Sequence, residues 1–119
     1  MADSILDSTA FVEIAAAAAS EKKAQSIIIM DMRQALPVTD YFLVASGTST
    51  TQVQAIADFI EEKLDEVGLK LLHKEGFREA HWILLDYGHF VAHIFTNDDR
   101  QFYNLEQLWV DAPSREFVS

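Results

Sequence analysis

The sequence predicts an α/β fold of the α+β type: a single two-layer domain with a mixed sheet of about five strands and helices packed on it. Two patterns lead to this prediction. Short apolar runs rich in β-branched residues are typical of buried strands, and longer segments with apolar residues every three or four positions are typical of amphipathic helices. The length of 119 residues indicates one domain over residues 1–119, with its core in about residues 8–112.

The first helix is expected over residues 8–23. This segment contains the run AAAAA, which favours helix more strongly than any other part of the chain. Ser8 or Thr9 can cap its amino end, because a hydroxyl oxygen accepts a hydrogen bond from a free backbone N–H group. Residues 1–7 carry no pattern of regular structure, and we expect them to fray.

Two buried strands and a second helix follow. Residues 26–32 (SIIIMDM) and 41–45 (YFLVA) are almost continuously apolar, which predicts strands covered on both faces. The turn at residues 46–49 (SGTS) leads into a helix with one apolar face and one acidic face. Gly68 ends this helix, because glycine readily adopts the left-handed conformation that follows a helix terminus.

The second half of the chain predicts three more strands. They cover residues 69–74, residues 82–87 (WILLDY) and residues 90–95 (FVAHIF). The last two are separated by residues 88–89, a glycine-containing junction that is typical of a β-hairpin.

The chain is expected to finish with a third helix. Asn97 can cap it and Pro113 ends it. Phe102 and Trp109 are expected to bury its apolar side in the core. The last six residues, 114–119, look unstructured.

Composition excludes several classes of function. The chain carries 19 acidic and 9 basic side chains, a net charge of -10, which argues against holding RNA or DNA by its phosphates and fits a basic partner. The chain has no cysteine, so disulfides, thiolate catalysis and Cys-ligated metals are excluded. No apolar run approaches the roughly 20 residues of a membrane span, and the amino terminus is too acidic for a secretory signal or transit peptide. We therefore expect a cytoplasmic protein.

The sequence gives little support for a metal site or for a catalytic nucleophile. His89 and His93 have the spacing of a zinc pair on a helix, but this segment is predicted to be a strand, where four residues span about 13 Å. No G-x-S-x-G elbow is present for a serine nucleophile. The acidic helix face over residues 58–66 is expected to be solvated and to help steer the protein toward a basic partner. We predict no metal and no cofactor.

The turn at residues 46–49 is the candidate for binding phosphate, because it leads from a strand into the amino end of a helix. It lacks a Walker A lysine, and no paired acidic residues follow to hold magnesium as in nucleotidyltransferases. We favour the interpretation that Gly47 provides a tight turn and that Ser49 and Gln52 form a capping box. A small nucleotide-binding enzyme that uses residues 47–49 is the alternative function.

The strand at residues 82–87 is the candidate for binding a macromolecule. Alternation divides its side chains between two faces, with Trp82, Leu84 and Asp86 on one and Ile83, Leu85 and Tyr87 on the other. An aromatic residue at a strand end, with a charge and a glycine beside it, is typical of a binding hot spot.

Blocks of residues along nearly the whole chain resemble a known family. They are residues 40–42 (DYF), 45–49 (ASGTS), 52–53 (QV), 55–58 (AIAD), 75–76 (EG), 82–88 (WILLDYG), 93–95 (HIF), Arg100, 102–103 (FY), 105–106 (LE) and 108–109 (LW). Together they are similar to the signature of the Iojap-like ribosomal silencing factor family. No single block is decisive, but so many in this order over residues 10–112 are highly specific.

The resemblance implies a binding function without catalysis. Members of that family bind the large ribosomal subunit through large-subunit ribosomal protein number fourteen, block subunit association and repress translation in stationary phase or starvation. Their fold is similar to that of nucleotidyltransferases without the catalytic carboxylates. Carried over to this sequence, the partner-binding region is Trp82, Leu84, Leu85, Asp86, Tyr87 and Gly88.

The sequence departs from the family pattern at three positions. Thr51 stands where arginine is common, Ala80 where glycine is common, and His89 where aspartate is usual. His89 lies beside the expected binding region and replaces a negative group with one that titrates near neutrality. We expect a ribosomal partner, no membrane, no direct contact with nucleic acid, and a monomer or a weak homodimer formed through a sheet edge.

Overall fold

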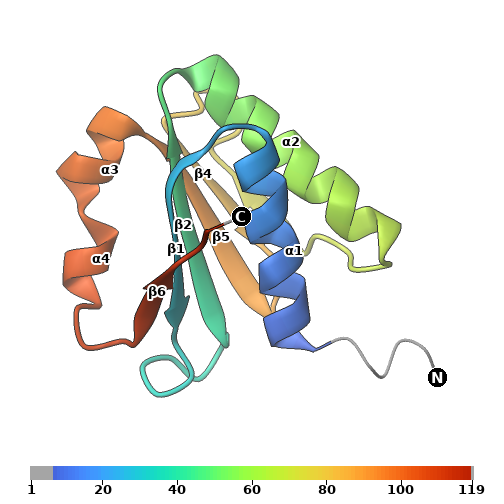
Figure 1. Cartoon of the computed structure of the whole chain (residues 1–119), viewed down its shortest axis with the longest axis vertical. Coiled ribbons are helices and arrows are strands. Elements are labelled where there is room, and N and C mark those ends of the chain that lie inside the picture. Colours follow the sequence, from blue (N-terminus) through green and yellow to red (C-terminus); the bar gives the residue numbers. More distant parts are fainter. Residues whose placement is uncertain (1–6, 119) are drawn as a thin grey trace.

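A mixed six-stranded sheet forms the centre of the molecule, with helices on both of its faces (Figure 1). The computed structural model describes residues 7–118. The helices are α1 (Ser8–Glu21), α2 (Thr50–Glu66), α3 (Asn97–Tyr103) and α4 (Leu105–Leu108). The strands are β1 (Gln25–Asp31), β2 (Tyr41–Gly47), β3 (His73–Glu75), β4 (Trp82–Asp86), β5 (Phe90–Thr96) and β6 (Ser114–Glu116).

The strand order is β3-β4-β5-β2-β1-β6. The central strands β2 and β5 pair in parallel, and every other pair is antiparallel. Both central strands are buried along almost their whole length, as their continuous apolar sequences predict. The predicted α+β fold with a mixed sheet is thus confirmed, with six strands in place of about five.

Helices α1 and α2 cover one face of the sheet (Figure 1). The alanines of α1 at positions 15, 16 and 19 are fully buried. Their small side chains let the helix backbone come close to the sheet and to α2. Helix α2 contributes the apolar face that its periodicity predicts: Val53, Ile56, Ala57, Ile60 and Leu64, all fully buried.

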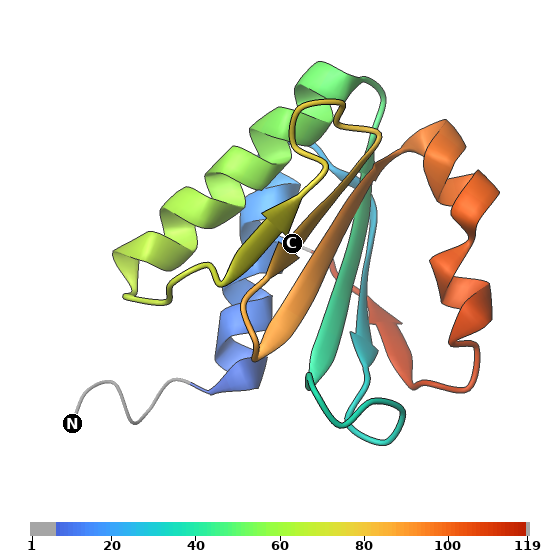
Figure 2. The same cartoon turned by 180° about the vertical axis from the view of Figure 1, so that it is seen from behind.

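Helices α3 and α4 lie on the opposite side of the sheet, and the reverse view shows them standing beyond its β1 half (Figure 2). Leu105 packs there against Met30, Phe42, Val44 and Phe95. These two short helices cover only part of the second face. The β4 end of that face is left partly open, and the candidate site is built there.

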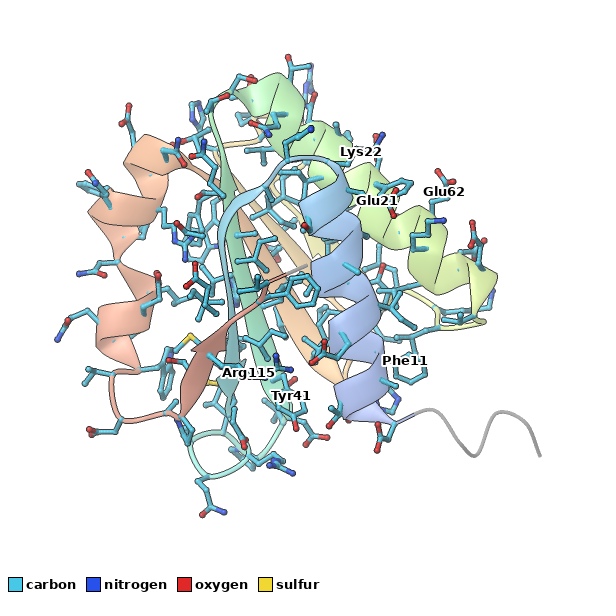
Figure 3. All side chains as sticks on the ribbon, in the orientation of Figure 1. Phe11, Glu21, Lys22, Tyr41, Glu62 and Arg115 are labelled. Carbon is cyan, nitrogen blue, oxygen red and sulfur yellow. The ribbon has the colours of Figure 1, made fainter. Side chains whose placement is uncertain are left out.

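Strand β6 corrects the prediction that residues 114–119 are unstructured. Ser114, Arg115 and Glu116 pair antiparallel with β1. Arg115, labelled in Figure 3, forms an ion pair with Glu13 of α1. The strand is short, polar and exposed, so it carries no apolar pattern by which sequence could identify it. Phe117, just beyond it, packs against the core.

Helix caps also differ from the prediction. Asp7 caps α1 in place of Ser8 or Thr9, and Thr96 caps the third helix in place of Asn97. Each true cap lies one or two residues before the predicted one, an error typical of boundaries read from sequence. The rest of the segment expected to fray, residues 1–6, lies outside the described residues.

Two further boundaries shift. The predicted final helix divides into α3 and α4 at Asn104, which adopts the left-handed conformation with φ of 48°. Asparagine tolerates this conformation better than most residues, and it ends α3 in the way a glycine would. Strand β3 begins at His73, later than the predicted strand over residues 69–74.

The loop before β4 depends on a close contact between Gly76 and the backbone of β4. Its φ is +78°, and a Cβ atom there would lie 2.1 Å from the backbone oxygen of Trp82. We expect Gly76→Ala to lower the free energy of unfolding by roughly 2–4 kcal/mol, because both the conformation and the contact oppose a side chain. Urea unfolding followed by circular dichroism measures this change.

Gly68→Ala is the matched control. Gly68 has a φ of +82°, but a Cβ atom would meet nothing within 4 Å. Only the conformational cost of about 1 kcal/mol remains. Equal losses for the two variants would contradict the close approach of Gly76 to β4.

Candidate functional site

Strand β4 alternates between the two sides of the sheet as predicted. Ile83 and Leu85 are fully buried under the helices, and Tyr87, just past the strand end, is 3% exposed. Tyr87 stacks on Phe90 with ring centroids 5.2 Å apart. The structure therefore makes Leu85 and Tyr87, two of the six predicted partner-binding residues, part of the core.

The other predicted binding residues, Trp82, Leu84, Asp86 and Gly88, are half-buried. The Asp86 carboxylate accepts a hydrogen bond from the Gly88 backbone N–H at 2.8 Å, and the Tyr87 N–H donates to the Phe90 carbonyl at 3.0 Å. These bonds close the predicted hairpin. A partner that approaches the open face of the sheet meets Trp82, Leu84 and Asp86 first.

Aromatic rings surround Trp82. Its indole stacks on Phe95 at 4.9 Å between centroids and contacts Tyr103 of α3 at 4.7 Å. The indole Nε1–H donates a hydrogen bond to Nδ1 of His93 at 3.2 Å. These contacts fix the orientation of an aromatic side chain that is itself half-buried at the edge of the open face.

His93 is a buried, neutral residue of this cluster. It is 4% exposed, and burial lowers the pKa of its imidazole to about 4. Because Nδ1 accepts from Trp82, the ring proton resides on Nε2, which has no hydrogen-bond partner among the described residues. Phe42 packs edge-on against the imidazole at 4.6 Å between ring centroids.

Helix α3 extends the apolar surface beyond the sheet. Phe102 is 79% exposed and Tyr103 is 49% exposed, and their rings are in contact with each other. The exposure of Phe102 corrects the prediction that it belongs to the core; Trp109 packs partly buried against the core, as expected. Sequence reasoning missed Phe102 because helical periodicity shows an apolar side but not whether anything covers it.

We call the residues of this region the open-sheet surface: Trp82, Leu84, Asp86, Phe102 and Tyr103. It joins the uncovered side of β4 to the outer side of α3. A mostly apolar surface with aromatic residues at its centre and a carboxylate at its margin is suited to binding another protein.

Arg100 anchors α3 beside this surface. Its guanidinium donates to Glu106 Oε2 at 2.8 and 3.2 Å, to the Ser46 hydroxyl at 3.1 Å and to the Gln25 carbonyl at 3.2 Å. The side chain of Arg100 is only 11% exposed. These bonds link the helix to β1 and β2, so Arg100 positions Phe102 and Tyr103.

Several polar groups of the turn at residues 46–49 form hydrogen bonds within the chain. Ser49 caps α2 by accepting from the Gln52 backbone N–H at 3.1 Å, as predicted. The Gln52 side chain accepts from the Thr48 backbone N–H at 2.7 Å and from the Thr48 hydroxyl at 3.1 Å, in place of completing the capping box. A Cβ atom on Gly47 would lie 3.0 Å from Gln52 Oε1, a contact so tight that the Gln52 side chain would have to shift slightly.

Comparison with known proteins assigns the chain to a family. The family model described as "Ribosomal silencing factor during starvation" (RsfS) matches residues 6–119. The chain belongs to the ribosomal silencing factor family. The predicted resemblance is therefore confirmed.

Individual members of the ribosomal silencing factor family align over nearly the whole chain. Ribosomal silencing factor RsfS of Bacillus subtilis (strain 168) is 46% identical over 108 residues, 91% of this chain and 92% of that protein. The chloroplastic protein Iojap of Zea mays is 33% identical over 114 residues, which cover 93% of this chain and 48% of that longer protein.

Solved structures agree with the fold. A crystal structure of a Chromobacterium violaceum protein matches with a TM-score of 0.87 at 28% identity and covers 96% of this chain and 95% of that one. A crystal structure of a Bacillus halodurans protein has a TM-score of 0.79 at 37% identity and covers 89% and 96% of the two chains. In the described part of this family member, no helix is long and apolar enough to cross a bilayer.

His93 predicts an acid-dependent loss of stability. Its pKa is about 4 in the folded protein against 6.5 when unfolded, so the unfolded chain takes up the proton first as the pH falls. The stabilisation is fully present above pH 6.5 and is lost toward pH 4. We expect the free energy of unfolding to fall by about 2 kcal/mol between pH 7 and pH 5 through this residue.

His93→Gln is the comparison variant, because a Gln side chain can accept from Trp82 without titrating. Urea unfolding at pH 7 and pH 5 should show a loss smaller by about 2 kcal/mol in the variant than in the wild type. The same pH dependence in both proteins would show that His93 is not neutral and buried in the folded state.

Proposed function

We propose that this protein binds the large ribosomal subunit through large-subunit ribosomal protein number fourteen and prevents its association with the small subunit. Membership of the ribosomal silencing factor family supports a ribosomal partner. The name of a mouse relative, "Mitochondrial assembly of ribosomal large subunit protein 1", also refers to the large subunit; that protein is 27% identical over 92 residues. The proposed consequence is repression of translation during starvation, and the proposed location is the cytoplasm.

The open-sheet surface is the proposed contact. It brings together Trp82, Leu84 and Asp86 of the predicted binding region with two exposed aromatic residues of α3. Aromatic residues held in one orientation contribute strongly to binding because little conformational entropy is lost on association. The net charge of -10 favours a basic ribosomal protein and disfavours direct contact with rRNA.

Steric exclusion is the proposed mechanism. The folded chain measures 43 × 31 × 27 Å along its principal axes. A body of this size, bound on the face of the large subunit that meets the small subunit, occupies space that the small subunit needs. Blocking subunit joining then requires only binding at that face.

The protein is proposed to work without catalysis. The backbone N–H and the hydroxyl of Thr48, two groups that could hold a phosphate, already donate to Gln52, and the Ser49 hydroxyl caps α2. A ligand would have to displace these bonds before the turn could bind an anion. This arrangement supports a structural role for the turn over the alternative of a nucleotide-binding enzyme.

Leu84→Ser tests the contact surface. Leu84 is half-buried on the open face, so its removal should disturb the proposed interface more than the core. We expect the dissociation constant for isolated Bacillus subtilis large subunits to rise about tenfold, because one apolar contact at an interface centre contributes about 1–2 kcal/mol. Co-sedimentation over a range of large-subunit concentrations measures it.

Val67→Ser is the matched control, since Val67 is 39% exposed at the end of α2 on the helix side of the sheet. Its affinity for large subunits should equal that of the wild type. Thermal melting verifies that both variants are folded. Undiminished binding by folded Leu84→Ser would place the contact elsewhere on the molecule.

A further inference from the structure

A groove of about 420 Å³ runs along α2 on the helix side of the sheet. One wall carries carboxylates at four positions of α2, and the other is formed by the segment that leads to β3 and by Tyr87. The lining residues are Asp58, Glu61, Glu62, Asp65, Leu69, Leu71 and Tyr87. Glu62 extends from α2 away from the body of the molecule (Figure 3). The lining thus combines acidic residues of α2 with the apolar side chains of Leu69 and Leu71.

The hydroxyl of Tyr87 supplies a second, independent feature of this groove. The side chain is 3% exposed and lines the groove, yet its hydroxyl makes no hydrogen bond within the part of the chain that the structure describes. Burial, with a further contribution from the charges of Glu61 and Asp65, raises the pKa of this hydroxyl, so it remains neutral. The hydroxyl is the tip of a nearly buried side chain that opens on the groove, where a ligand group can form a hydrogen bond with it.

The spacing of the carboxylates favours an extended cationic ligand over a metal ion. Positions 58, 61, 62 and 65 lie on one side of the helix, in a row about 10 Å long. Among the described residues, no three His, Asp or Glu side chains lie close enough to hold one metal ion. An extended peptide projects alternate side chains in the same direction about 7 Å apart, which fits two cations along this row.

We propose that this groove binds a basic peptide segment, with one lysine or arginine side chain between Glu61, Asp65 and the Tyr87 hydroxyl. The cation donates hydrogen bonds to the carboxylates and to the hydroxyl oxygen. Apolar side chains of the peptide lie against Leu69 and Leu71. The four negative charges on one wall make the charge of the site complementary to such a segment.

A lysine of the chain itself already uses part of the site. Lys74 Nζ lies 2.9 Å from Glu61 Oε2 and over the ring of Phe77 at 4.7 Å. Glu61 can therefore hold an ammonium group at this end of the groove. Lys74 competes with an incoming cation for the same carboxylate, so its removal should tighten binding.

This site is separate from the proposed large-subunit contact. The groove lies on the α2 side of the sheet, whereas the open-sheet surface lies on the opposite side. The inference does not depend on the proposed function, and its test uses no ribosomes. Either proposal can fail without the other.

The test uses the full-length protein and a fluorescein-labelled peptide of sequence KLKAKLK, with fluorescence anisotropy as the measurement at low ionic strength. Two comparison peptides replace every lysine, one with arginine and the other with glutamate. Saturable binding of the two basic peptides and none of the acidic peptide is expected. Absence of saturable binding by both basic peptides would overturn the proposal.

Tyr87→Phe removes only the hydroxyl and keeps the ring stacked on Phe90. We expect it to weaken binding of KLKAKLK about three- to fivefold, the usual net effect of losing one hydrogen bond. Tyr103→Phe makes the same deletion on α3 and should leave the affinity unchanged. Equal affinities for wild type and Tyr87→Phe, both folded by thermal melting, would overturn the role of the hydroxyl.

Charge variants distinguish binding at this groove from non-specific electrostatic attraction of a basic peptide to an acidic protein. The double variant Glu61→Gln with Asp65→Asn should weaken peptide binding by about tenfold or more. The control is Asp111→Asn with Glu116→Gln, which changes the net charge equally and should alter the affinity by less than about twofold. Lys74→Gln should tighten binding about twofold, and Arg78→Gln should not. Equal losses for the two double variants would show non-specific electrostatics and overturn the site.

Discussion

The parallel pairing of β2 with β5 is the contact on which the rest of the structure depends. Both strands are almost continuously apolar, so both faces of the sheet must be covered at its centre. Helices α1 and α2 cover the centre of one face, while the second face receives only the short α3 and α4. Because α3 and α4 are too short to cover the whole second face, one side of β4 is left open. The surface proposed to bind the ribosome lies on this uncovered part of the sheet.

The cluster around Trp82 shows how the core gives this surface its rigidity. Burial keeps His93 neutral, and a neutral imidazole accepts the indole N–H. Phe95 and Tyr103 hold the remaining sides of the indole. One buried polar bond therefore fixes the side chain that joins β4 to α3, and Arg100 fixes α3 itself through Glu106 and Ser46.

Sequence predicted the parts of the fold that depend on local pattern. The apolar runs of β2 and β5, the amphipathic α2 and the hairpin at Gly88 each carry their signal within a few residues. Strand β6 could not be predicted, because Ser114, Arg115 and Glu116 form a strand only by pairing with distant β1. Burial within the predicted binding region could not be predicted either. Alternation divides the side chains of β4 between two faces, but only the packing of the helices shows that Leu85 and Tyr87 are buried. In the same way, only the short α3 shows that Phe102 is exposed.

Light scattering, which follows the joining of ribosomal subunits, shows whether the bound protein excludes the small subunit. Large subunits are incubated with the purified protein and then mixed with small subunits at a magnesium concentration that supports association. We expect the protein to reduce the amplitude of joining in proportion to its occupancy of large subunits, and preincubation with small subunits alone to have no effect. Full joining at saturating occupancy of the large subunit would rule out steric exclusion.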